Sequence, residues 1–321
     1  MRHILSLTNN KTEMKHIHVH SQHHDVTHPV NGRFIFCVAL NSLYVICEAA
    51  AGFRYGSMAL LSDAGHNLGD VFSLLLVLLS FWLVGLKGNS RFSYGYKKSS
   101  VLISLVNAVI LLVAVGAIIL ESFHRLQSSQ QVYGQMMSWI AGLGIIINGL
   151  TAWLLMKDKD KDLNIKGAFL HMLADTLVSL GVVFSGIAIS IWGCAWLDPM
   201  VSIVIAVVIL FSTFKLLKES LCMALDGVPE SVDNQKIIEH INEMTEIEGW
   251  HHLHIWPVST KENAATLHVV LRDISGMSDI KKDLKRCFAE HGVSHCTIEI
   301  ETTDETCDDL SCCTTDKIDK K

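Results

Sequence analysis

Long apolar runs separated by short polar breaks fill the chain from residue 33 to residue 217. Six of these runs are mostly apolar over their whole length: 33–53, 57–84, 100–120, 136–156, 165–191 and 197–217. A helix needs about 20 such residues to cross the hydrocarbon core of a bilayer, so each run predicts one membrane-spanning helix. The polar segment before residue 33 lacks the apolar core of a secretory signal peptide, and we expect the first span itself to direct insertion.

A different pattern begins after the sixth run. Helical spacing and strand-like alternation predict a helix, two strands, a helix and a strand, in that order, at 232–244, 251–258, 265–271, 280–288 and 294–301. The order α-β-β-α-β is typical of a small α+β domain. The chain therefore divides into a His-rich arm (1–32), a six-helix transmembrane domain (33–217), an α+β domain (218–302) and a polar, Cys-containing tail (303–321) that is expected to be disordered.

The composition of the chain supports a membrane protein and excludes one class of partner, nucleic acid. Hydrophobic residues make up 50% of the chain and charged residues only 18%, whereas about 25% of a soluble domain is charged. The net charge of −6 is spread along the chain and shows no basic stripe, which excludes nucleic acid as a partner. The nine cysteines are scattered and do not form the pattern of a disulfide framework.

Lys and Arg are distributed unequally between the two sides of the predicted membrane. Fourteen lie near span ends on one side, within 2–33, 87–98, 157–166 and 215–218, and two lie on the other side, at Arg54 and Arg125. Because cytoplasmic loops carry the excess of positive residues, we expect a multi-pass protein of the cell (inner) membrane with both termini in the cytoplasm. The second span then runs inward and the fifth outward, so these two helices are antiparallel.

Two pairs of ionisable residues lie inside predicted spans, where a charged side chain costs about 2.5 to 3.5 kcal/mol and marks an ion pathway by default. His66 and Asp70 are four residues apart in the second span, and His171 and Asp175 repeat that spacing in the fifth. Residues four apart share a helix face, and antiparallel helices would place each His beside the other helix's Asp. Two imidazoles and two carboxylates favour tetrahedral Zn²⁺, with Cd²⁺ or Co²⁺ as alternatives. For a single pair, a hydrogen bond that joins two helices would be an equal explanation, but the repeated spacing favours the metal site.

Histidines also gather at the start of the first predicted strand of the α+β domain. Regular alternation would turn His252 and His254 to one face and His251 to the other. With His268 nearby, such a face can supply metal ligands, and ordinary packing histidines are the alternative.

Other candidates are left open by the pattern. The histidines of the arm can form a loose metal-binding tract or a solvated segment. Glu48 and Asp63 lie inside spans, where a buried carboxylate needs a partner. The tail offers soft ligands, but a mobile tail would give no fixed geometry to Cys307, Cys312 and Cys313.

Taken together, these motifs resemble the cation diffusion facilitator family, the zinc-type proton-coupled metal exporters, over nearly the whole chain. The similarity is carried by the segment 56–66 with Asp70, by 94–96, by 171–175, by 197–199 and by 251–256. The resemblance implies that His66, Asp70, His171 and Asp175 form the transport site. It also implies a ferredoxin-like, copper-chaperone-like α+β domain that forms a homodimer and binds metal, such as Zn²⁺, at positions that match His251 and His268.

Two features depart from the family pattern. Lys98 and Ser100 stand where many members have Arg and Glu, which puts any metal or salt-bridge role of that Glu in doubt. The loop 157–162 is short and resembles that of bacterial members.

The expected activity is export of Zn²⁺ from the cytoplasm in exchange for protons, through a site that faces each side of the membrane in turn. Imidazole suits this exchange because its pKa is about 6.5. The expected partners are divalent metal ions, protons, the lipid bilayer and a second copy of the chain, with metal as the transported substrate and no other cofactor. Two alternatives remain, a membrane-anchored metal sensor and an intramembrane metalloenzyme. The second is disfavoured because a site with four protein ligands leaves no position for an activated water, so we expect no enzyme.

Overall fold

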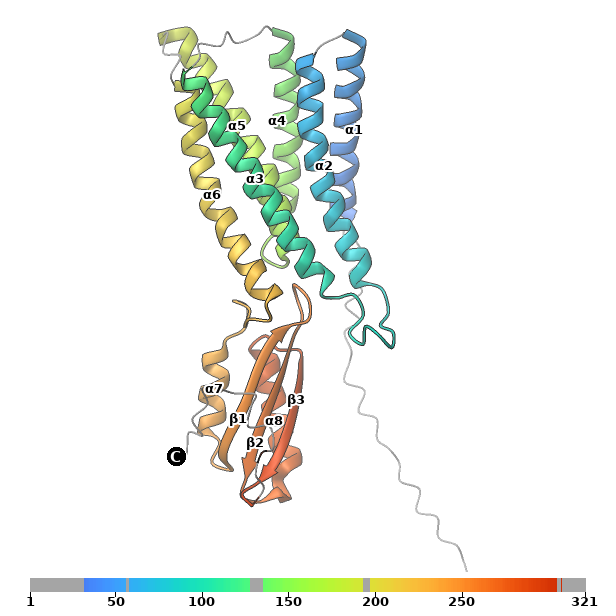
Figure 1. The fold of residues 1–321 in the computed structure, drawn as a ribbon, viewed down its shortest axis with the longest axis vertical. Helices are drawn as coiled ribbons and strands as arrows, with labels where there is room; N and C mark the ends of the chain where they lie inside the picture. Colours follow the sequence, from blue (N-terminus) through green and yellow to red (C-terminus); the bar gives the residue numbers. More distant parts are fainter. Residues whose placement is uncertain (1–31, 56–57, 128–134, 193–196, 305–306, 308–321) are drawn as a thin grey trace, which may run out of the picture.

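Six long helices form a bundle that stands on a small α+β domain (Figure 1). The structure is a computed structural model that describes residues 32–55, 58–127, 135–192, 197–304 and 307. The bundle consists of α1 (Gly32–Tyr55), α2 (Met58–Val84), α3 (Ser99–Gln127), α4 (Gln135–Leu155), α5 (Leu163–Trp192) and α6 (Leu197–Ala224). The predicted six-helix architecture is confirmed. α3 and α6 end at Gln127 and Ala224, beyond the predicted ends at residues 120 and 217. The prediction followed apolar residues alone, whereas both helices continue into polar residues.

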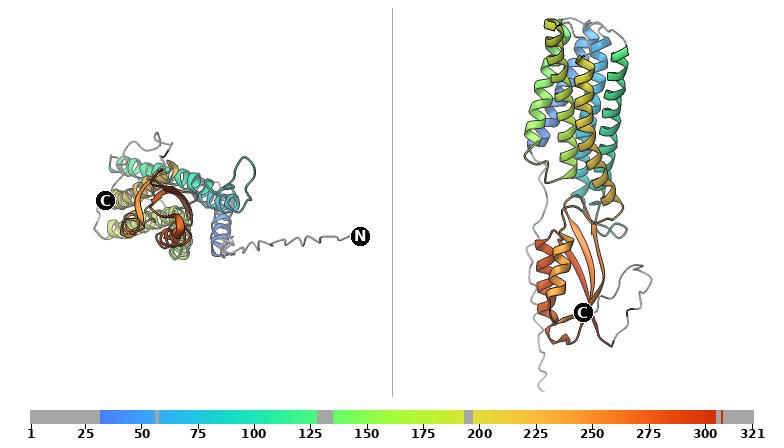
Figure 2. Two further views of the ribbon diagram at one scale, coloured as in Figure 1. Left: turned by 90° about the horizontal axis from the view of Figure 1, so that it is seen from below. Right: turned by 90° about the vertical axis from the view of Figure 1, so that its left-hand side faces the viewer.

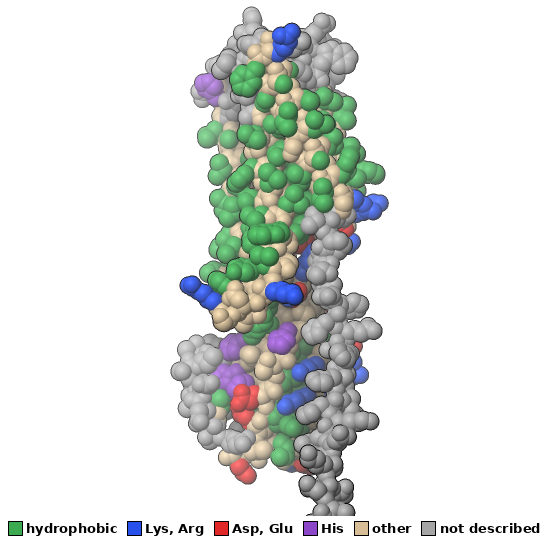
Figure 3. All heavy atoms as spheres, turned by 90° about the vertical axis from the view of Figure 1, so that its right-hand side faces the viewer, with side chains coloured by type: hydrophobic (Ala, Val, Ile, Leu, Met, Phe, Trp, Pro, Cys, Tyr) green, Lys and Arg blue, Asp and Glu red, His purple; other side chains and the backbone are tan. Residues whose placement is uncertain are grey.

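The outer surface of the bundle is apolar. Large side chains such as Leu43, Trp82 and Phe211 are 60%, 60% and 74% exposed, and hydrophobic side chains cover the visible face of the bundle in Figure 3. A continuous apolar surface marks contact with a membrane or a partner. Among the described residues, three stretches are long and apolar enough to cross a membrane, Gly32–Ala51, Asn67–Val84 and Ser99–Leu120, and Gly142–Leu155 is a shorter apolar helix.

Basic residues gather at the end of the bundle that faces the α+β domain. The α2–α3 loop at 85–98 and the α4–α5 loop at 156–162 both lie at this end (Figure 1), and Figure 3 shows Lys and Arg near this junction. These loops hold Lys87, Arg91, Lys97, Lys98, Lys157, Lys159 and Lys161. The basic loops and the α+β domain, both expected in the cytoplasm, therefore lie on the same side of the bundle.

The α+β domain is a three-stranded sheet with both of its helices on one face (Figure 2). Its elements are α7 (Asn234–Glu243), β1 (Ile247–Pro257), β2 (Asn263–Leu271), the short 3-10 turn η1 (Ile274–Gly276), α8 (Met277–Glu290) and β3 (His295–Thr302). The strand order is β1-β2-β3; β1 and β2 are antiparallel and β2 and β3 are parallel. A parallel pair needs a crossover connection, which α8 provides, and the predicted order α-β-β-α-β is confirmed.

The core of this domain explains the placement of its helices. Apolar residues at helical spacing, Ile237 and Ile241 in α7 and Leu284 and Phe288 in α8, pack with Leu267 of β2. The Asp233 side chain accepts a hydrogen bond from the backbone N–H of Lys236 and so caps α7. The opposite face of the sheet is left uncovered by helices, and it carries the histidines of β1 and β2.

The turn between β1 and β2 contacts the bundle. Lys98 Nζ lies 2.5 Å from Asp226 Oδ1 and donates to the carbonyl oxygen of Pro257 at 3.0 Å. The backbone N–H of Thr260 donates to Ser100 Oγ at 3.1 Å. The two positions that depart from the family pattern, Lys98 and Ser100, therefore connect the two domains.

Asp162 joins the same turn to the start of α5. Its Oδ1 accepts a hydrogen bond from the backbone N–H of Asn164 at 2.8 Å, the bond of a helix N-cap. Its Oδ2 lies 3.3 Å from Thr260 Oγ1 and 3.3 Å from Lys261 Nζ. One buried carboxylate thus both begins the helix that carries His171 and holds the β1–β2 turn.

Replacing Asp162 by Ala is expected to lower the free energy of unfolding by about 1 to 2 kcal/mol, because the N-cap bond and the contact with Lys261 are both lost. Asp162→Asn keeps a capping oxygen and should lose less. Thermal unfolding of the detergent-purified protein measures the difference, with Asp160→Ala, an exposed acid of the same loop, as the control. Equal midpoints for all three variants would contradict the capping role.

Candidate metal centre

Asp70 and His171 lie on two antiparallel helices. α2 runs toward the α+β domain and α5 runs away from it (Figure 1), as the charge distribution predicted. The two side chains are deeply buried, with relative exposures of 2% for Asp70 and 5% for His171. A carboxylate and an imidazole in the bundle interior need each other as partners, because no lipid group can replace a lost hydrogen bond.

Three of the four residues predicted for the site lie together, on the two antiparallel helices. His171 Nε2 lies 2.5 Å from Asp70 Oδ1 on the other helix and 3.7 Å from Asp175 Oδ2, one turn along its own helix. One ligand atom from each of these three residues lies within 4.8 Å of the other two. His66 belongs to α2, one turn before Asp70, but its side chain and that of Asp63 lie outside the described residues.

The distances between the side chains of Asp70, His171 and Asp175 fit a protonated site and are close to those of a site that holds a metal ion. The contact between His171 Nε2 and Asp70 Oδ1 is a hydrogen bond, which needs a proton between the two atoms. A tetrahedral Zn²⁺ with bonds of about 2.0 Å holds its ligand atoms about 3.3 Å apart and needs a lone pair from each. To take an ion, Asp70 and His171 must therefore release this proton and part slightly while Asp175 comes closer.

A buried polar cluster lies beside the site, and it was only partly foreseen. The carboxylate of Glu48, which is 3% exposed, accepts from Asn67 Nδ2 at 2.9 Å and from the Tyr44 hydroxyl at 3.1 Å. Asn67 follows His66 in α2, so Glu48 holds α1 against the turn of α2 that leads to Asp70. Glu48 was predicted to need a partner. Asn67 and Tyr44 were missed, although their polar character within apolar runs is a visible signal.

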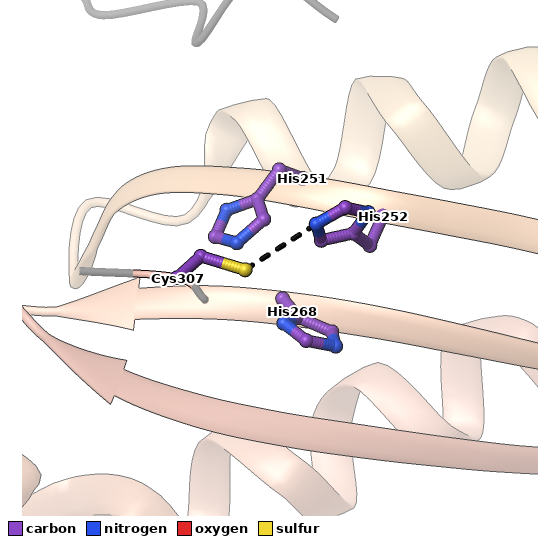
Figure 4. A group of neighbouring side chains, drawn as sticks. All are labelled: His251, His252, His268 and Cys307. Carbon is purple, nitrogen blue, oxygen red and sulfur yellow. Dashed lines mark hydrogen bonds between the residues drawn. The ribbon is translucent and has the colours of Figure 1, made fainter. Parts of the chain in front are cut away.

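The α+β domain holds a second group of possible ligands. His251 and His268 face each other across β1 and β2 as register partners, with ring centroids 5.1 Å apart. His252 lies 4.8 Å from His251 and 4.9 Å from His268 by the same measure. All three imidazoles are therefore on one face of the sheet, the face that carries no helix (Figure 4).

The prediction that His251 faces away from His252 is wrong. β1 has a register shift between His251 and His254, and His252 has a φ of +52°, in the left-handed region. A bulge of this kind interrupts the alternation of a strand and re-aims a side chain. The sequence argument assumed an unbroken strand, and the irregular backbone turns two successive histidines to the same side.

Glu301 in β3 contacts two of these histidines. Its Oε1 lies 2.8 Å from His268 Nδ1 and 3.2 Å from His251 Nε2. A carboxylate that takes the N–H of one ring nitrogen directs the other nitrogen toward a metal. Glu301 was missed because its nearness depends on the parallel pairing of β2 with β3; the Glu299 and Glu301 alternation was its only sequence signal.

Cys307 reaches the same group from the chain beyond β3. Its Sγ lies 3.3 Å from His252 Nε2, so the expectation of a tail without fixed geometry is wrong at this position. Cys312, Cys313 and the histidines of the N-terminal arm lie outside the described residues.

The chain is similar to known membrane transporters over most of its length. Residues 34–223 match the family model of the cation efflux transmembrane domain, and residues 229–303 match that of the cation efflux protein cytoplasmic domain. A cadmium, cobalt and zinc/H(+)-K(+) antiporter of Bacillus subtilis (strain 168) is 35% identical over 275 residues, which cover 84% of this chain and 88% of the relative. The zinc transporter ZitB of Escherichia coli (strain K12) is 32% identical over 291 residues, 90% of this chain and 93% of the relative. ZitB of Yersinia pestis is 33% identical over 272 residues, 84% and 87% of the two chains.

Replacing Asp70 by Asn removes one anionic oxygen at nearly constant volume. We expect the affinity of the intramembrane site for Zn²⁺ to fall by about tenfold or more, since even outer-shell changes lower metal affinity by about 10- to 100-fold. Titration calorimetry on detergent-purified protein measures this, with His251→Ala, His252→Ala, His268→Ala and Cys307→Ala combined in every sample to remove the second group of possible ligands.

The matched control is Ser73→Ala, a buried position on α2 three residues after Asp70. It should bind Zn²⁺ as the parent does. An unchanged affinity in Asp70→Asn would remove Asp70 from the site.

Proposed function

Because the chain belongs to the cation efflux family of membrane transporters, we propose that it exports Zn²⁺, together with Cd²⁺ or Co²⁺, from the cytoplasm in exchange for protons. Its relatives are named as transporters of zinc, cadmium and cobalt, and one group as H(+)-K(+) antiporters. The family consists of transporters, so the alternative of an intramembrane metalloenzyme is set aside. The observation that carries the proposal is the buried group of Asp70, His171 and Asp175 between two antiparallel helices.

The transport site consists of His66, Asp70, His171 and Asp175. Three of these offer ligand atoms within 4.8 Å of one another, and His66 lies one turn before Asp70 on the same helix. Two imidazole nitrogens and two carboxylate oxygens suit Zn²⁺ and its neighbours, while harder ions such as Mg²⁺ prefer oxygen ligands alone. Four protein ligands can replace the hydration shell that the ion leaves in the water.

Proton exchange follows from the hydrogen bond between His171 and Asp70. When the site opens to the cytoplasm, an arriving ion takes the Nε2 lone pair of His171 and an oxygen of Asp70, and the proton between them leaves. When the site opens outward, protons return to these atoms and the ion departs. Export thus needs two orientations of one site, which paired helix bundles achieve by rocking.

The protein is oriented with its α+β domain in the cytoplasm, and it forms a homodimer. The basic loops and the α+β domain lie at one end of the bundle, which supports a cytoplasmic location for that end and for both termini in the cell membrane. The α+β domain matches the family's cytoplasmic domain, which supports a homodimer. His251 and His268 are proposed as cytoplasmic metal ligands, and this group is the observation that favours a regulatory role beside transport.

Asp175→Ala is expected to abolish metal uptake into inverted membrane vesicles, because the ion loses a carboxylate that lies 3.7 Å from His171 Nε2. Uptake of Zn²⁺, Cd²⁺, Co²⁺ and Mn²⁺ by parent and variant also ranks the substrates. Asp160→Ala, which removes an exposed carboxylate outside the bundle interior, should transport as the parent does. If the parent protein carried none of these ions, the chain would be a sensor and not an exporter.

An acidic vesicle lumen should accelerate Zn²⁺ uptake, because each pH unit adds about 1.4 kcal/mol per exchanged proton. The sign follows from the site: protons on the lumenal side return to His171 and Asp70 and release the ion. Uptake is measured with a fluorescent zinc indicator in proteoliposomes, with and without a protonophore, and with lumenal K⁺ varied separately. A rate that ignores the imposed pH gradient would remove proton exchange from the mechanism.

A further inference from the structure

The α2–α3 loop, residues 85–98, lies where the apolar surface of the bundle ends. The two stretches that flank it, Asn67–Val84 and Ser99–Leu120, are both long and apolar enough to cross a membrane. Figure 3 shows Lys and Arg at the lower edge of the hydrophobic surface of the bundle, and the loop stands to one side of the α+β domain in Figures 1 and 2. The loop therefore begins and ends at the boundary between the hydrocarbon core and the lipid headgroups.

The charges of this loop are all of one sign. It carries four cations and no Asp or Glu, the cations being Lys87, Arg91, Lys97 and Lys98. The α4–α5 loop at the same end of the bundle, residues 156–162, alternates three Lys with three Asp and is therefore neutral. Of these two loops, only the α2–α3 loop presents net positive charge.

The four cations of the α2–α3 loop divide into two pairs. Lys97 Nζ lies 2.5 Å from Glu262 Oε2, and Lys98 Nζ lies 2.5 Å from Asp226 Oδ1, so acids that follow α6 in the chain neutralise this pair. Lys87 and Arg91 are exposed, and no carboxylate in the part of the chain that the structure describes forms an ion pair with either. The charges of Lys87 and Arg91 are thus available to a ligand from outside the chain.

The backbone of the loop is folded tightly and fixes Arg91 and Phe92 at its surface. Asn89 Oδ1 accepts hydrogen bonds from the backbone N–H groups of Arg91 and Phe92, both at 2.9 Å, as in an Asx turn. Gly95 has a φ of +69°, and a Cβ there would lie 2.9 Å from the carbonyl oxygen of Leu86, so the position requires glycine. A loop held in this way can bind a ligand without first losing conformational entropy.

Two aromatic side chains are exposed beside these cations. Phe92 is 44% exposed and Tyr94 is 50% exposed. The Phe92 ring centroid lies 5.0 Å from that of Tyr96 and 6.0 Å from the guanidinium carbon of Arg91. Aromatic rings are enriched at the boundary between lipid and water, and cations near that boundary are attracted to anionic lipids. Exposed rings and unpaired cations on one rigid loop therefore favour contact with a lipid over a loop that is merely solvated.

We propose that the α2–α3 loop binds the headgroup of an anionic phospholipid, with Lys87 and Arg91 on the phosphate and with Phe92 and Tyr94 at the top of the acyl chains. The planar donor fork of Arg matches phosphate, and Lys adds a point charge. One pair of cations then contacts lipid while the other contacts acids that follow α6, so a bound lipid fixes the loop between the membrane and the α+β domain. The inference rests on the proposed function only for the leaflet, which is the cytoplasmic one.

Photo-crosslinking of the full-length protein in nanodiscs locates the contact. The discs consist of phosphatidylcholine with a trace of photoactivatable phosphatidylglycerol or, in parallel, of photoactivatable phosphatidylcholine with the same reactive acyl chain. Mass spectrometry of peptides from a protease that does not cleave at Lys or Arg should find more phosphatidylglycerol than phosphatidylcholine on the peptide that contains Phe92 and Tyr94. Equal labelling by the two lipids would overturn the proposal. So would loss of the label to excess inorganic phosphate at constant ionic strength, because the loop would then bind free phosphate.

The double variant Lys87→Ala/Arg91→Ala tests the two proposed headgroup ligands. The phosphatidylglycerol label should fall by about tenfold or more, since each cation near an anionic surface strengthens binding by about fivefold. The matched control is Lys157→Ala/Lys159→Ala, which removes the same charge from the neutral loop at the same end of the bundle and should keep the label of the parent. An equal fall in both variants would reduce the contact to non-specific attraction and overturn the site.

Asn89→Asp separates the charge of the loop from its folding. Asp keeps the acceptor oxygen of the Asx turn, so the midpoint of thermal unfolding in detergent should equal that of the parent. It also adds an anion beside Arg91, and the phosphatidylglycerol label should fall by about fivefold. An unchanged label would overturn the proposal, whatever the midpoint. None of these measurements requires metal transport, so the lipid site and the proposed export can each fail alone.

Discussion

Inside a bilayer no water replaces a lost partner, and this constraint governs the contact between His171 and Asp70. Their side-chain atoms lie 2.5 Å apart on two antiparallel helices, and both side chains are deeply buried. The pair therefore fixes how α2 and α5 lie against each other. In the proposed mechanism a metal ion enters this site only when a proton leaves it, so the chemistry of exchange and the stability of the bundle would depend on the same two side chains.

Two other buried carboxylates, Glu48 and Asp162, join structural elements outside the site. Glu48 joins α1 to α2 through Asn67. Asp162 caps α5, the helix that carries His171, and contacts the β1–β2 turn through Thr260. The intramembrane site and the α+β domain are thus linked by contacts that each satisfy a buried carboxylate, because an acid removed from water must be hydrogen-bonded or paired.

The two proposed metal sites differ in ways that match different tasks. The intramembrane group offers nitrogen and carboxylate oxygen, which protons can displace at moderate pH. The group on the sheet offers three imidazoles and a thiol within 4.8 Å of one another, a softer set that suits Zn²⁺ or Cd²⁺. The first would release its ion on each transport cycle, while the second would keep its ion as long as the cytoplasm supplies it.

The sequence by itself determined the six apolar helices, the α-β-β-α-β order and the four-residue spacing of the two His-Asp pairs. These features depend on the length of apolar runs, on the period of apolar residues and on spacing within one helix, all of which are local properties of the chain. Tertiary structure decided what depends on irregular backbone or on strand pairing. The bulge at His252 reversed the expected facing of His251, and parallel pairing placed Glu301 against His268. The return of Cys307 across the sheet could not be inferred from spacing, because residues 55 positions apart meet only after β3 has taken its place beside β2.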